Sequence, residues 1–525
     1  MAEHLSPSSL SVSEVDQSLP LPEAPPVALR AALGRLFRQY DIRGVVEEEL
    51  ETHRESWGER AELTPHLAYA IGCAYAAELI QAREAGEIEA EALWVAIGYD
   101  ARLSGPSLIA ALERGLRRSG VNVFRLGLVP TPVVYFATHE LAQEAQGCHG
   151  GIMVTGSHNP SQWNGFKMSL GSHSLYGERL QLLARRVVEG DYSSLSEDRS
   201  ALTSAQDLDL SARYIDALKA RLTWGDRPLK ELKVVLDAGH GASGQLAERF
   251  FTSLGVQVRG LYLEPDGRFP AHHPDPTVEE NLTDLKEAVR AWGADVGLGF
   301  DGDGDRIGVV DREGEVIWGD QLLLLFAQQI LRETPGASII GEVKCSQALY
   351  DGIREAGGVP EMWRVGHSLI KARMRETRSP LAGEMSGHIF FADRFYGYDD
   401  AIYAGARLLE RLTEPGFDLS QWRRALPPSV TTPELRVWCA DEDKASVIAR
   451  VIEGFSARYE VNSIDGARIS FPGGWGLVRA SNTQPVLVMR FEAESAERLD
   501  EVRSEVERWL QEHAPEVRFD VDPNH

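Results

Sequence analysis

Cysteine is scarce in this sequence, and the few thiols lie far apart in the chain. The 525 residues include four cysteines, Cys73, Cys148, Cys345 and Cys439, and no two of them form a CxxC pair. Structural zinc sites and disulfide frameworks depend on more closely organised cysteines. The sequence therefore argues against both kinds of site, and a cytoplasmic location fits this cysteine usage best.

Long apolar runs and an excess of basic residues are also absent. No apolar run approaches the roughly 18 residues that a membrane-spanning helix needs, and residues 1–26 lack the basic and apolar regions of a signal peptide. The formal net charge of −25 disfavours binding to nucleic acid or to anionic membranes. If the substrate is an anion, a local group of basic residues must overcome this negative field.

The length and the alternation of patterns predict four domains. Apolar strands alternate with helical segments up to Pro427 and Pro428, which is typical of parallel α/β units, whereas the pattern after these prolines predicts a small α+β domain. The first residues are rich in Ser, Pro and Glu, which is typical of disorder. We expect a disordered extension at 1–30, α/β domains at 31–205, 206–308 and 309–427, and an α+β domain at 428–525.

Three apolar strands run into loops rich in glycine and aspartate. They lie at 94–102, 233–244 and 294–306. Because the same strand-and-loop pattern recurs, we expect the α/β domains to share one plan.

One loop places a hydroxyl beside an imidazole. Residues 155–160 read Thr-Gly-Ser-His-Asn-Pro and follow an apolar run that predicts a buried strand. Functional loops tend to lie at strand ends, so Ser157, next to His158, is a candidate nucleophile. The alternative is a structural turn, since Ser, Asn and Pro are ordinary turn formers.

A second loop is typical of a metal site. Asp301, Asp303 and Asp305 alternate with glycines, and in an extended segment a period of two directs all three carboxylates to one side. Like charges this close repel unless a cation lies among them. Arg306 and Arg312 stand where an EF-hand needs Gly and Glu, so Mg²⁺ fits better than Ca²⁺. The alternative is an Asp/Gly turn with solvated charges.

Two further loops carry groups suited to phosphate and sugar. Residues 479–485 offer a guanidinium, two hydroxyls and consecutive N–H groups, which can bind phosphate or can simply cap a strand. Glu384, Ser386 and His388 stand at alternate positions, where an extended loop would present them together to sugar hydroxyls.

Several basic residues accompany these loops. We expect Ser368 to cap a helix that has Lys371 in its first turn, where a cation opposes the helix dipole. This misfit indicates an anion nearby, although a solvated lysine is equally compatible with it. Further positive charge is available at these positions: Arg43, Lys167, Arg306, Lys344 and Arg479.

A serine, a carboxylate trio, a sugar-diol loop and a phosphate loop together make up the inventory of a phosphosugar enzyme. The sequence resembles the α-D-phosphohexomutases, most closely the bacterial phosphomannomutase/phosphoglucomutase branch. The resemblance covers the chain from about residue 36 onward, and its motifs follow the family order. They lie at 40–44, 155–160, 301–306, 365–368, 383–388 and 479–483.

The resemblance implies four domains around a central active-site cleft, three of them related α/β domains and the last a smaller α+β domain. It implies that Ser157 carries a phosphoryl group and, with Asp301, Asp303 and Asp305, holds one Mg²⁺ per chain. His158 is then a phosphate contact, and Arg306 another active-site residue. The remaining implied residues bind sugar hydroxyls (Glu384, Ser386), bind the phosphate that is not transferred (Arg479, Ser481, Asn482, Thr483) or line the cleft (Arg43, Lys167, Lys344, His367).

The implied reaction interconverts hexose 1-phosphate and hexose 6-phosphate of mannose, glucose or both. It runs through a 1,6-bisphosphosugar intermediate, and a hexose 1,6-bisphosphate acts as activator. His388, His367 and Lys167 are candidates for the general base. The partners are small phosphosugars, and the protein is expected to be a monomer or a dimer.

Three alternatives remain at this point. A phosphoglucosamine mutase is disfavoured by Met385, since those enzymes usually carry Gln there. A Mg²⁺-dependent sugar phosphatase would not need two phosphate sites, and the run from Asp301 through Arg306 does not give the DxDxT pattern of enzymes with an aspartyl nucleophile. A non-catalytic phosphosugar-binding protein would not need every catalytic position filled.

Overall fold

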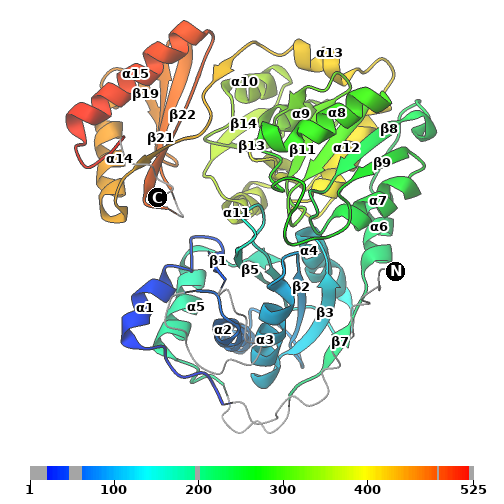
Figure 1. The fold of residues 1–525 in the computed structure, drawn as a ribbon, viewed down its shortest axis with the longest axis vertical. Coiled ribbons are helices and arrows are strands. Elements are labelled where there is room, and N and C mark those ends of the chain that lie inside the picture. The colour runs from blue at the N-terminus through cyan, green and yellow to red at the C-terminus, as the bar shows by residue number, and fades with distance from the viewer. Residues whose placement is uncertain (1–19, 47–61, 196–201, 482–483, 520–525) are drawn as a thin grey trace.

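The computed structural model describes residues 20–46, 62–195, 202–481 and 484–519. Within these residues the chain forms four β-sheets, one after another along the sequence, and helices pack against each of them (Figure 1). The expected fold class, with three α/β domains and a smaller α+β domain, is confirmed. No helix of the described segments is both long enough and apolar enough to cross a bilayer.

The first sheet has seven strands in the order β1-β5-β4-β2-β3-β7, with β6 paired to β5. Its strands are β1 (Ile42–Val45), β2 (Trp94–Tyr99), β3 (Asn122–Leu128), β4 (Gly150–Val154), β5 (Trp163–Leu170), β6 (His173–Ser174) and β7 (Ala205–Asp207). Its helices are α1 (Val27–Gly34), α2 (Pro65–Glu84), α3 (Gly105–Arg118), α4 (Thr131–Glu140) and α5 (Gly177–Glu189).

The second and third sheets are smaller. The second has the order β12-β11-β10-β8-β9, and the third has the order β14-β13-β15-β16. The strands are β8 (Lys233–Asp237), β9 (Gln257–Leu261), β10 (Val296–Phe300), β11 (Ile307–Asp311), β12 (Val316–Ile317), β13 (Ser338–Glu342), β14 (Val359–Trp363), β15 (Leu381–Gly383) and β16 (Ile389–Phe391). The helices are α6 (Ser211–Lys219), α7 (Gly244–Ser253), α8 (Thr283–Trp292), α9 (Gly319–Glu333), α10 (Gln347–Glu355), α11 (His367–Thr377), α12 (Ala401–Leu412) and α13 (Leu419–Arg424).

These three sheets contain the same four-strand unit. In each unit the first strand pairs in parallel with the second and the third, and the fourth strand lies antiparallel to the third. The units are β2-β3-β4-β5, β8-β9-β10-β11 and β13-β14-β15-β16. The expected common plan is therefore present. The loops at 94–102 and 233–244 correspond, whereas 301–306 follows β10, the counterpart of β4.

The C-terminal sheet has six strands in the order β17-β22-β21-β20-β19, with β18 paired to β22. Its elements are β17 (Val430–Thr431), β18 (Leu435–Trp438), α14 (Asp441–Ser456), β19 (Glu460–Asn462), β20 (Ala467–Phe471), β21 (Gly474–Ala480), β22 (Val486–Ala493) and α15 (Ala496–His513). The domain has its own apolar core, from Val437 to Val517. By contrast, one apolar cluster runs through the first three domains, from Trp94 to Leu419.

Three expected boundaries differ from the structure. The one expected after residue 205 falls inside β7, which pairs with β3 in the first sheet. Residues 1–19 lie outside the described residues, but the expected disorder is wrong for 20–30, because α1 begins at Val27 and the Pro20 carbonyl accepts the Tyr69 hydroxyl at 2.9 Å. The boundary expected after residue 308 falls inside β11, which pairs with both β10 and β12. The second sheet therefore continues to Ile317.

Two glycines allow α2 and α3 to pack at backbone contact. A Cβ added at Gly72 would lie 2.3 Å from the carbonyl oxygen of Leu112, and one added at Gly115 would lie 2.3 Å from that of Tyr69. Neither carbonyl can move without shifting its helix, so a methyl group at either position forces the two helices apart.

We expect Gly115→Ala to destabilise the protein by about 1–3 kcal/mol, the usual cost of overpacking. Gly34→Ala is the matched control, because Gly34 lies in α1 with open space around the position of a Cβ. The control should unfold at or slightly above the native temperature, since Ala restricts the unfolded chain more than Gly. Thermal unfolding of the three proteins tests the packing, and an unchanged midpoint for Gly115→Ala contradicts it.

An ion pair between half-buried His272 and buried Asp237 fixes the loop that follows β9. His272 Nε2 lies 3.1 Å from both carboxylate oxygens of Asp237, and its Nδ1 lies 3.0 Å from the His273 carbonyl oxygen. Both partners accept hydrogen bonds, so the protonated ring can donate from both nitrogens. Burial lowers the pKa of His272, but the hydrogen bond and charge of Asp237 outweigh burial, and the net pKa lies above the ordinary 6.5.

This raised pKa predicts a pH-dependent contribution to stability. A group whose pKa is higher in the folded state stabilises fully below its unfolded pKa, and that stabilisation is lost as the pH rises through the folded pKa. His272→Gln should therefore reduce the free energy of unfolding more at about pH 5.5 than at about pH 8.5, on either side of an ordinary histidine pKa.

Denaturant unfolding at both pH values measures the difference. His513→Gln, at the exposed end of α15, is the control and should show little effect at either pH. An equal loss for His272→Gln at the two pH values contradicts the ion pair.

Candidate active site

Three loops from three different sheets meet at one place. They join the third strand of each four-strand unit to the fourth, at 155–162, 301–306 and 384–388. Ser157 Oγ donates a hydrogen bond to Asp301 Oδ2 at 2.9 Å, and Arg306 forms an isolated β-bridge with His388. The structure thus brings together the serine, aspartate and sugar loops that the sequence singled out.

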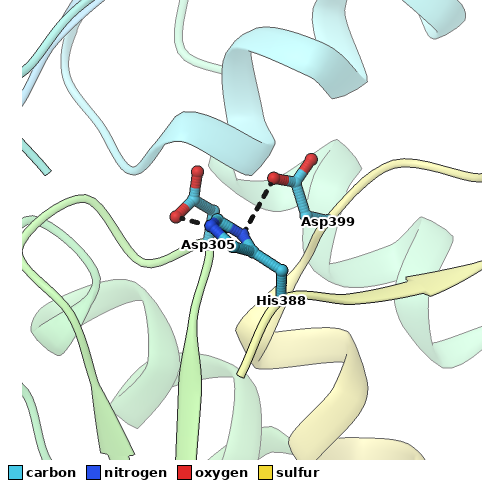
Figure 2. Close-up of side chains that lie close together, drawn as sticks. All are labelled: Asp305, His388 and Asp399. Carbon is cyan, nitrogen blue, oxygen red and sulfur yellow. Dashed lines mark ion pairs between the residues drawn. The ribbon is translucent and has the colours of Figure 1, made fainter. Parts of the chain in front are cut away.

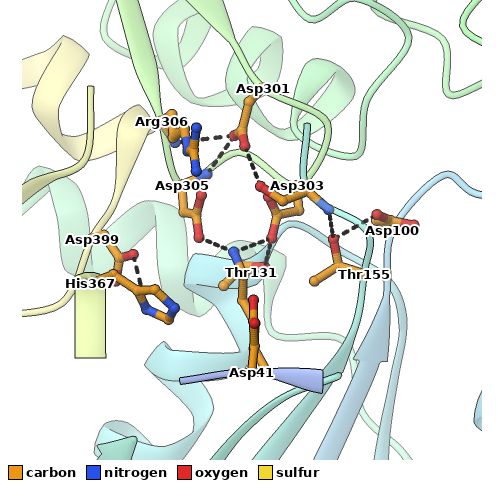
Figure 3. Close-up of polar contacts among 12 residues, drawn as sticks. Asp41, Asp100, Thr131, Thr155, Asp301, Asp303, Asp305, Arg306, His367 and Asp399 are labelled. Carbon is orange, nitrogen blue, oxygen red and sulfur yellow. Dashed lines mark hydrogen bonds and ion pairs between the residues drawn. The ribbon is translucent and has the colours of Figure 1, made fainter. Parts of the chain in front are cut away.

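The serine loop holds Ser157 in an unusual conformation. Its φ of +49° lies in the left-handed region, which costs a residue other than Gly about 1–3 kcal/mol. The Ser157 N–H donates to Thr155 Oγ1 at 2.7 Å, and this hydroxyl donates to Asp100 Oδ2 at 2.7 Å (Figure 3). The Ser157 side chain also lies 3.3 Å from His158 Nδ1. The loop is a turn, as the sequence predicted, and it directs the hydroxyl toward Asp301.

The three aspartates of the second loop are fully buried (Figure 3). They converge through a turn rather than through the expected extended segment. Gly304 has a φ of +74°, and Asp301 Oδ1 accepts the N–H groups of Asp305 and Arg306, both at 3.1 Å. The prediction of a compact carboxylate trio was correct, but its stated geometric reason was wrong.

Cations partly compensate the buried carboxylates. Lys167 Nζ donates to Asp303 Oδ2 at 2.7 Å and also to Asp305. Burial raises the pKa of Asp303, but Lys167, with a hydrogen bond from Thr131, outweighs it and brings the pKa below its ordinary value. Burial raises the pKa of Asp301 well above its ordinary value, and Asp303 and Asp305 add to that rise.

The trio has the donor atoms of a site for a hard cation. One ligand atom from each aspartate lies within 4.8 Å of the others. Asp303 Oδ1 and Asp305 Oδ1 are buried without a hydrogen-bond partner. Carboxylate oxygens in a compact group are the ligands that Mg²⁺ prefers, and it usually binds one or two of them together with phosphate oxygens. The residues therefore fit a divalent cation.

A second cluster lies beside the trio, around His388 (Figure 2). His388 Nδ1 is 3.1 Å from Asp399 Oδ2 and 3.7 Å from Asp305 Oδ1. Asp399 also accepts from Lys371 Nζ at 2.9 Å. The anion near Lys371 is therefore a protein carboxylate, although α11 begins at His367 and leaves Lys371 beyond its expected place in the first turn. Sequence reasoning missed Asp399, whose only local signal was a pair of aspartates before a helix.

The hydrogen bonds of His388 define its tautomer. Arg306 Nε donates to His388 Nε2 at 3.0 Å. A guanidinium can only donate, so Nε2 is the acceptor and the neutral ring carries its proton on Nδ1, facing Asp399. Arg306 and Lys371 supply positive charge to this second cluster, which leaves less need for a metal there than at the aspartate trio.

Two other candidate histidines are held neutral. Burial lowers the pKa of His158 well below its ordinary value, and Arg306 and Arg43 add to the effect. Burial also lowers the pKa of His367 well below its ordinary value, with a further contribution from Lys371. His367 begins α11 itself, so Ser368 lies inside the helix rather than at the expected cap.

The sugar loop is connected to Lys344 through one buried carboxylate. Glu342, at the end of β13, accepts the Lys344 N–H at 2.6 Å and the Met385 N–H at 3.2 Å. In the same loop Glu384 accepts the Gly366 N–H at 2.8 Å, and Ser386 is half-buried. Sequence reasoning missed Glu342, because a glutamate at the end of an apolar strand carries no distinctive local pattern.

The remaining candidate residues each have partners within the protein. Arg43 donates to the Thr155 carbonyl at 2.8 Å. Lys344 pairs with Glu434 at 3.3 Å, and Arg479 pairs with Asp465 at 3.2 Å. Ser481 Oγ accepts the Gln484 N–H at 3.2 Å, whereas Asn482 and Thr483 lie outside the described residues.

Four family models match successive parts of the chain. Three are described as phosphoglucomutase/phosphomannomutase α/β/α domains I, II and III and match residues 34–179, 212–314 and 318–430. The fourth is described as the C-terminal domain and matches residues 434–508. The chain belongs to the phosphoglucomutase/phosphomannomutase family.

Individual members of the family are similar over nearly their whole length. A phosphomannomutase/phosphoglucomutase from Pseudomonas syringae pv. tomato is 42% identical over 92% of this chain and 96% of its own. A phosphoglucomutase from Neisseria gonorrhoeae is 40% identical over 89% of this chain and 95% of its own. A crystal structure of a family protein from Burkholderia thailandensis, 40% identical, covers 93% of this chain and 99% of its own with a TM-score of 0.81.

The geometry of the buried trio predicts that Lys167 and a divalent cation both neutralise the negative charge of the three carboxylates. In Lys167→Met the three carboxylates lose their internal ammonium, and their repulsion increases. We expect this variant to unfold at a lower temperature than the native protein in EDTA. Added Mg²⁺ should raise its unfolding temperature by more than it raises that of the native protein.

Thermal unfolding with EDTA and with Mg²⁺ measures this difference. Lys344→Met is the control, because it removes a buried ammonium whose partner, Glu434, lies outside the trio. Mg²⁺ should raise the unfolding temperature of the control by as much as it raises that of the native protein. An equal rise for Lys167→Met would contradict the idea that Lys167 and the cation both neutralise the trio.

Proposed function

We propose that the protein is a phosphohexomutase that interconverts the 1-phosphate and 6-phosphate of mannose, glucose or both. The observation that carries this proposal is the Ser157 hydroxyl, held 2.9 Å from Asp301 at the edge of a buried carboxylate trio. The family, and relatives named phosphomannomutase/phosphoglucomutase that match nearly end to end, support the same reaction.

Ser157 acts as a phosphoryl carrier in this proposal. It transfers its phosphoryl group to the free hydroxyl of the bound hexose phosphate, which becomes a 1,6-bisphosphosugar. The bisphosphate then changes its orientation in the site. Its other phosphoryl group is transferred to Ser157, and the isomeric monophosphate leaves. In each half of the cycle one P–O bond forms and one breaks, and the proton of the attacking hydroxyl passes by way of the general base to the departing oxygen.

Asp301, Asp303, Asp305 and a phosphate oxygen on Ser157 would hold Mg²⁺, which supplies charge neutralisation for phosphoryl transfer. Arg43, Lys167 and Arg306 add positive charge around the same centre. His158, 3.3 Å from Ser157 Oγ, contacts the phosphoryl group. A neutral imidazole can do so by donating a hydrogen bond.

His388 is the general base that we propose. Burial lowers the pKa of Lys167, but Asp303 and Asp305 outweigh burial and raise it above its ordinary value, so this ammonium is a poor proton acceptor. His388 has its Nδ1 on Asp399 and its Nε2 available as an acceptor once Arg306 moves to the phosphate. A carboxylate behind an imidazole orients the ring and stabilises its protonated form.

The remaining residues bind the sugar and the phosphate that is not transferred. Glu384 and Ser386 are suited to sugar hydroxyls, and His367 lies beside them at the start of α11. Lys344 pairs with Glu434 and Arg479 with Asp465, and each cation releases its carboxylate when it binds phosphate. Ser481, Asn482 and Thr483 complete the phosphate loop in this proposal.

Several finer points belong to the same proposal. One Mg²⁺ binds per chain, and a hexose 1,6-bisphosphate restores the phosphoserine when it is lost. The enzyme is cytoplasmic and is a monomer or a dimer. The domain with the serine loop extends to the end of β7, the aspartate-loop domain extends to the end of β12, and the C-terminal domain begins near residue 428.

The phosphatase and binding alternatives are weaker than this proposal. A phosphatase would not need Lys344 and Arg479 as a second set of phosphate-binding side chains, and a binding protein would not need a strained Ser157 next to a metal site.

For the sugar, Met385 favours mannose and glucose over glucosamine. Parallel assays with the three sugar 1-phosphates rank them by kcat/KM, and a clear preference for glucosamine 1-phosphate would overturn that choice.

The serine assignment predicts the outcome of one substitution. Ser157→Ala should lower kcat for glucose 1-phosphate isomerisation at least about 1000-fold, because the covalent carrier is lost. Ser161→Ala, an exposed serine of the same loop, is the control and should keep native activity. A coupled assay with Mg²⁺ and glucose 1,6-bisphosphate measures both, and native turnover by Ser157→Ala excludes the mechanism.

A further inference from the structure

A fully buried arginine lies beneath the serine loop and has no part in the mechanism described above. Arg102 is 1% exposed, and Asp100, its ion-pair partner, is 0% exposed. Both follow β2 directly, in a segment of the sequence that pattern reasoning placed at a strand end without assigning a role. Burying a guanidinium is expensive unless every N–H group finds an acceptor.

The Arg102 guanidinium meets that condition with five contacts. Its Nε donates to Asp100 Oδ2 at 3.2 Å. Its Nη2 donates to the carbonyls of Ser157 at 2.7 Å and Asn159 at 2.6 Å. Its Nη1 donates to the carbonyls of Pro160 at 2.6 Å and Trp163 at 2.8 Å. All five N–H groups of the fork are therefore used, and four of the acceptors are main-chain oxygens, three in the serine loop and one at the first residue of β5.

The strand order of the first sheet places Arg102 next to the serine loop. β2 and β4 are parallel neighbours, so Asp100 and Thr155 emerge at the same edge, with the Asp100 N–H donating to the Val154 carbonyl at 3.1 Å. Asp100 Oδ2 also accepts the Thr155 hydroxyl at 2.7 Å, and that hydroxyl accepts the Ser157 N–H. The loop is thus held at its N–H side by Thr155 and at its carbonyl side by Arg102, and Asp100 anchors both.

Two further contacts, with Gly156 and with Phe269, fix the position of the guanidinium. A Cβ added at Gly156 would lie 2.3 Å from Arg102 Cζ, so only glycine permits the loop to approach this closely. On another side the guanidinium faces the ring of Phe269, with Cζ 5.3 Å from the ring centroid. Phe269 belongs to the loop after β9 that the His272–Asp237 pair fixes, so the second domain also supports the position of Arg102.

We propose that Arg102 is a positioning residue for phosphoryl transfer, which holds Ser157 in its left-handed conformation so that the side chain faces the aspartate trio. This inference rests on the proposed function. Arg102 binds only main-chain oxygens of the loop, so it leaves the Ser157 hydroxyl and the His158 ring free to face Asp301. Lysine cannot replace it, because one ammonium with three N–H groups cannot serve four carbonyls and a carboxylate.

The test compares Arg102→Lys with a matched control, Arg407→Lys. Arg407 is also fully buried and pairs with Asp393 at 2.9 Å and Glu410 at 2.8 Å, but it lies in α12, away from the serine loop. For each protein we would measure the thermal midpoint, kcat and KM for glucose 1-phosphate. A single-turnover experiment would then give the rate at which ³²P passes from the phosphoserine to the sugar.

We expect Arg102→Lys to lower kcat and the single-turnover rate by about 10-fold or more, because a shift of about 1 Å in a reacting group can cost roughly 100-fold. KM should change by less than about threefold, since the sugar and phosphate contacts are intact. Arg407→Lys should lower only the thermal midpoint. Native kcat and a native transfer rate in Arg102→Lys would overturn the proposal, whatever the change in stability.

A second variant decides the question if Arg102→Lys does not fold. Thr155→Val keeps the shape of the side chain and removes the hydrogen bonds that join Asp100 to the Ser157 N–H. A lowered transfer rate at nearly native KM supports loop positioning, and a native rate overturns it. If the native protein itself neither isomerises hexose phosphates nor accepts ³²P on Ser157, the proposed function fails rather than this inference.

Discussion

Three carboxylates at one buried point impose the main constraint on this structure. Asp301, Asp303 and Asp305 are each 0% exposed, and like charges so placed are tolerated only if positive charge or hydrogen-bond donors surround them. Lys167, on β5 of the first domain, compensates Asp303 and Asp305. Arg306 directly follows the trio in the second domain, and its backbone pairs with His388 in the loop of the third. The first three domains therefore meet where the charge must be neutralised.

The repeated four-strand unit explains how three domains can supply one centre. In each domain the hairpin between the third and fourth strands carries one of the three loops, and each repeat presents different groups there: the Ser157 hydroxyl, the buried carboxylates that begin at Asp301, and the Glu384 carboxylate, for which we propose sugar binding. The C-terminal domain follows another plan and has its own core. It adds Arg479, which Asp465 holds while that carboxylate also accepts the Val365 N–H from the third domain.

Much of the fold could be predicted because the signals were local. The alternation of apolar strands with helical segments up to Pro428 predicted α/β units, and three sheets with parallel strands and packed helices follow one another in that part of the chain. The period-two argument for the aspartate and sugar loops was wrong, because Gly304 and Gly387 adopt positive φ and turn the chain. Glycine conformation depends on the surrounding contacts, and the spacing of side chains does not reveal it.

The sequence by itself determined the α/β repeats, the order of the motifs and the kinds of groups available for chemistry, because these depend on residue types at short spacing. Only the tertiary structure decided which groups face one another. Ser157 meets Asp301, His388 meets Asp399, and Arg102 meets three carbonyls of the serine loop and one at the start of β5. Such pairings arise when parallel strands end at one edge and separate domains bury their charges together, and burial of that kind leaves no pattern in a single stretch of sequence.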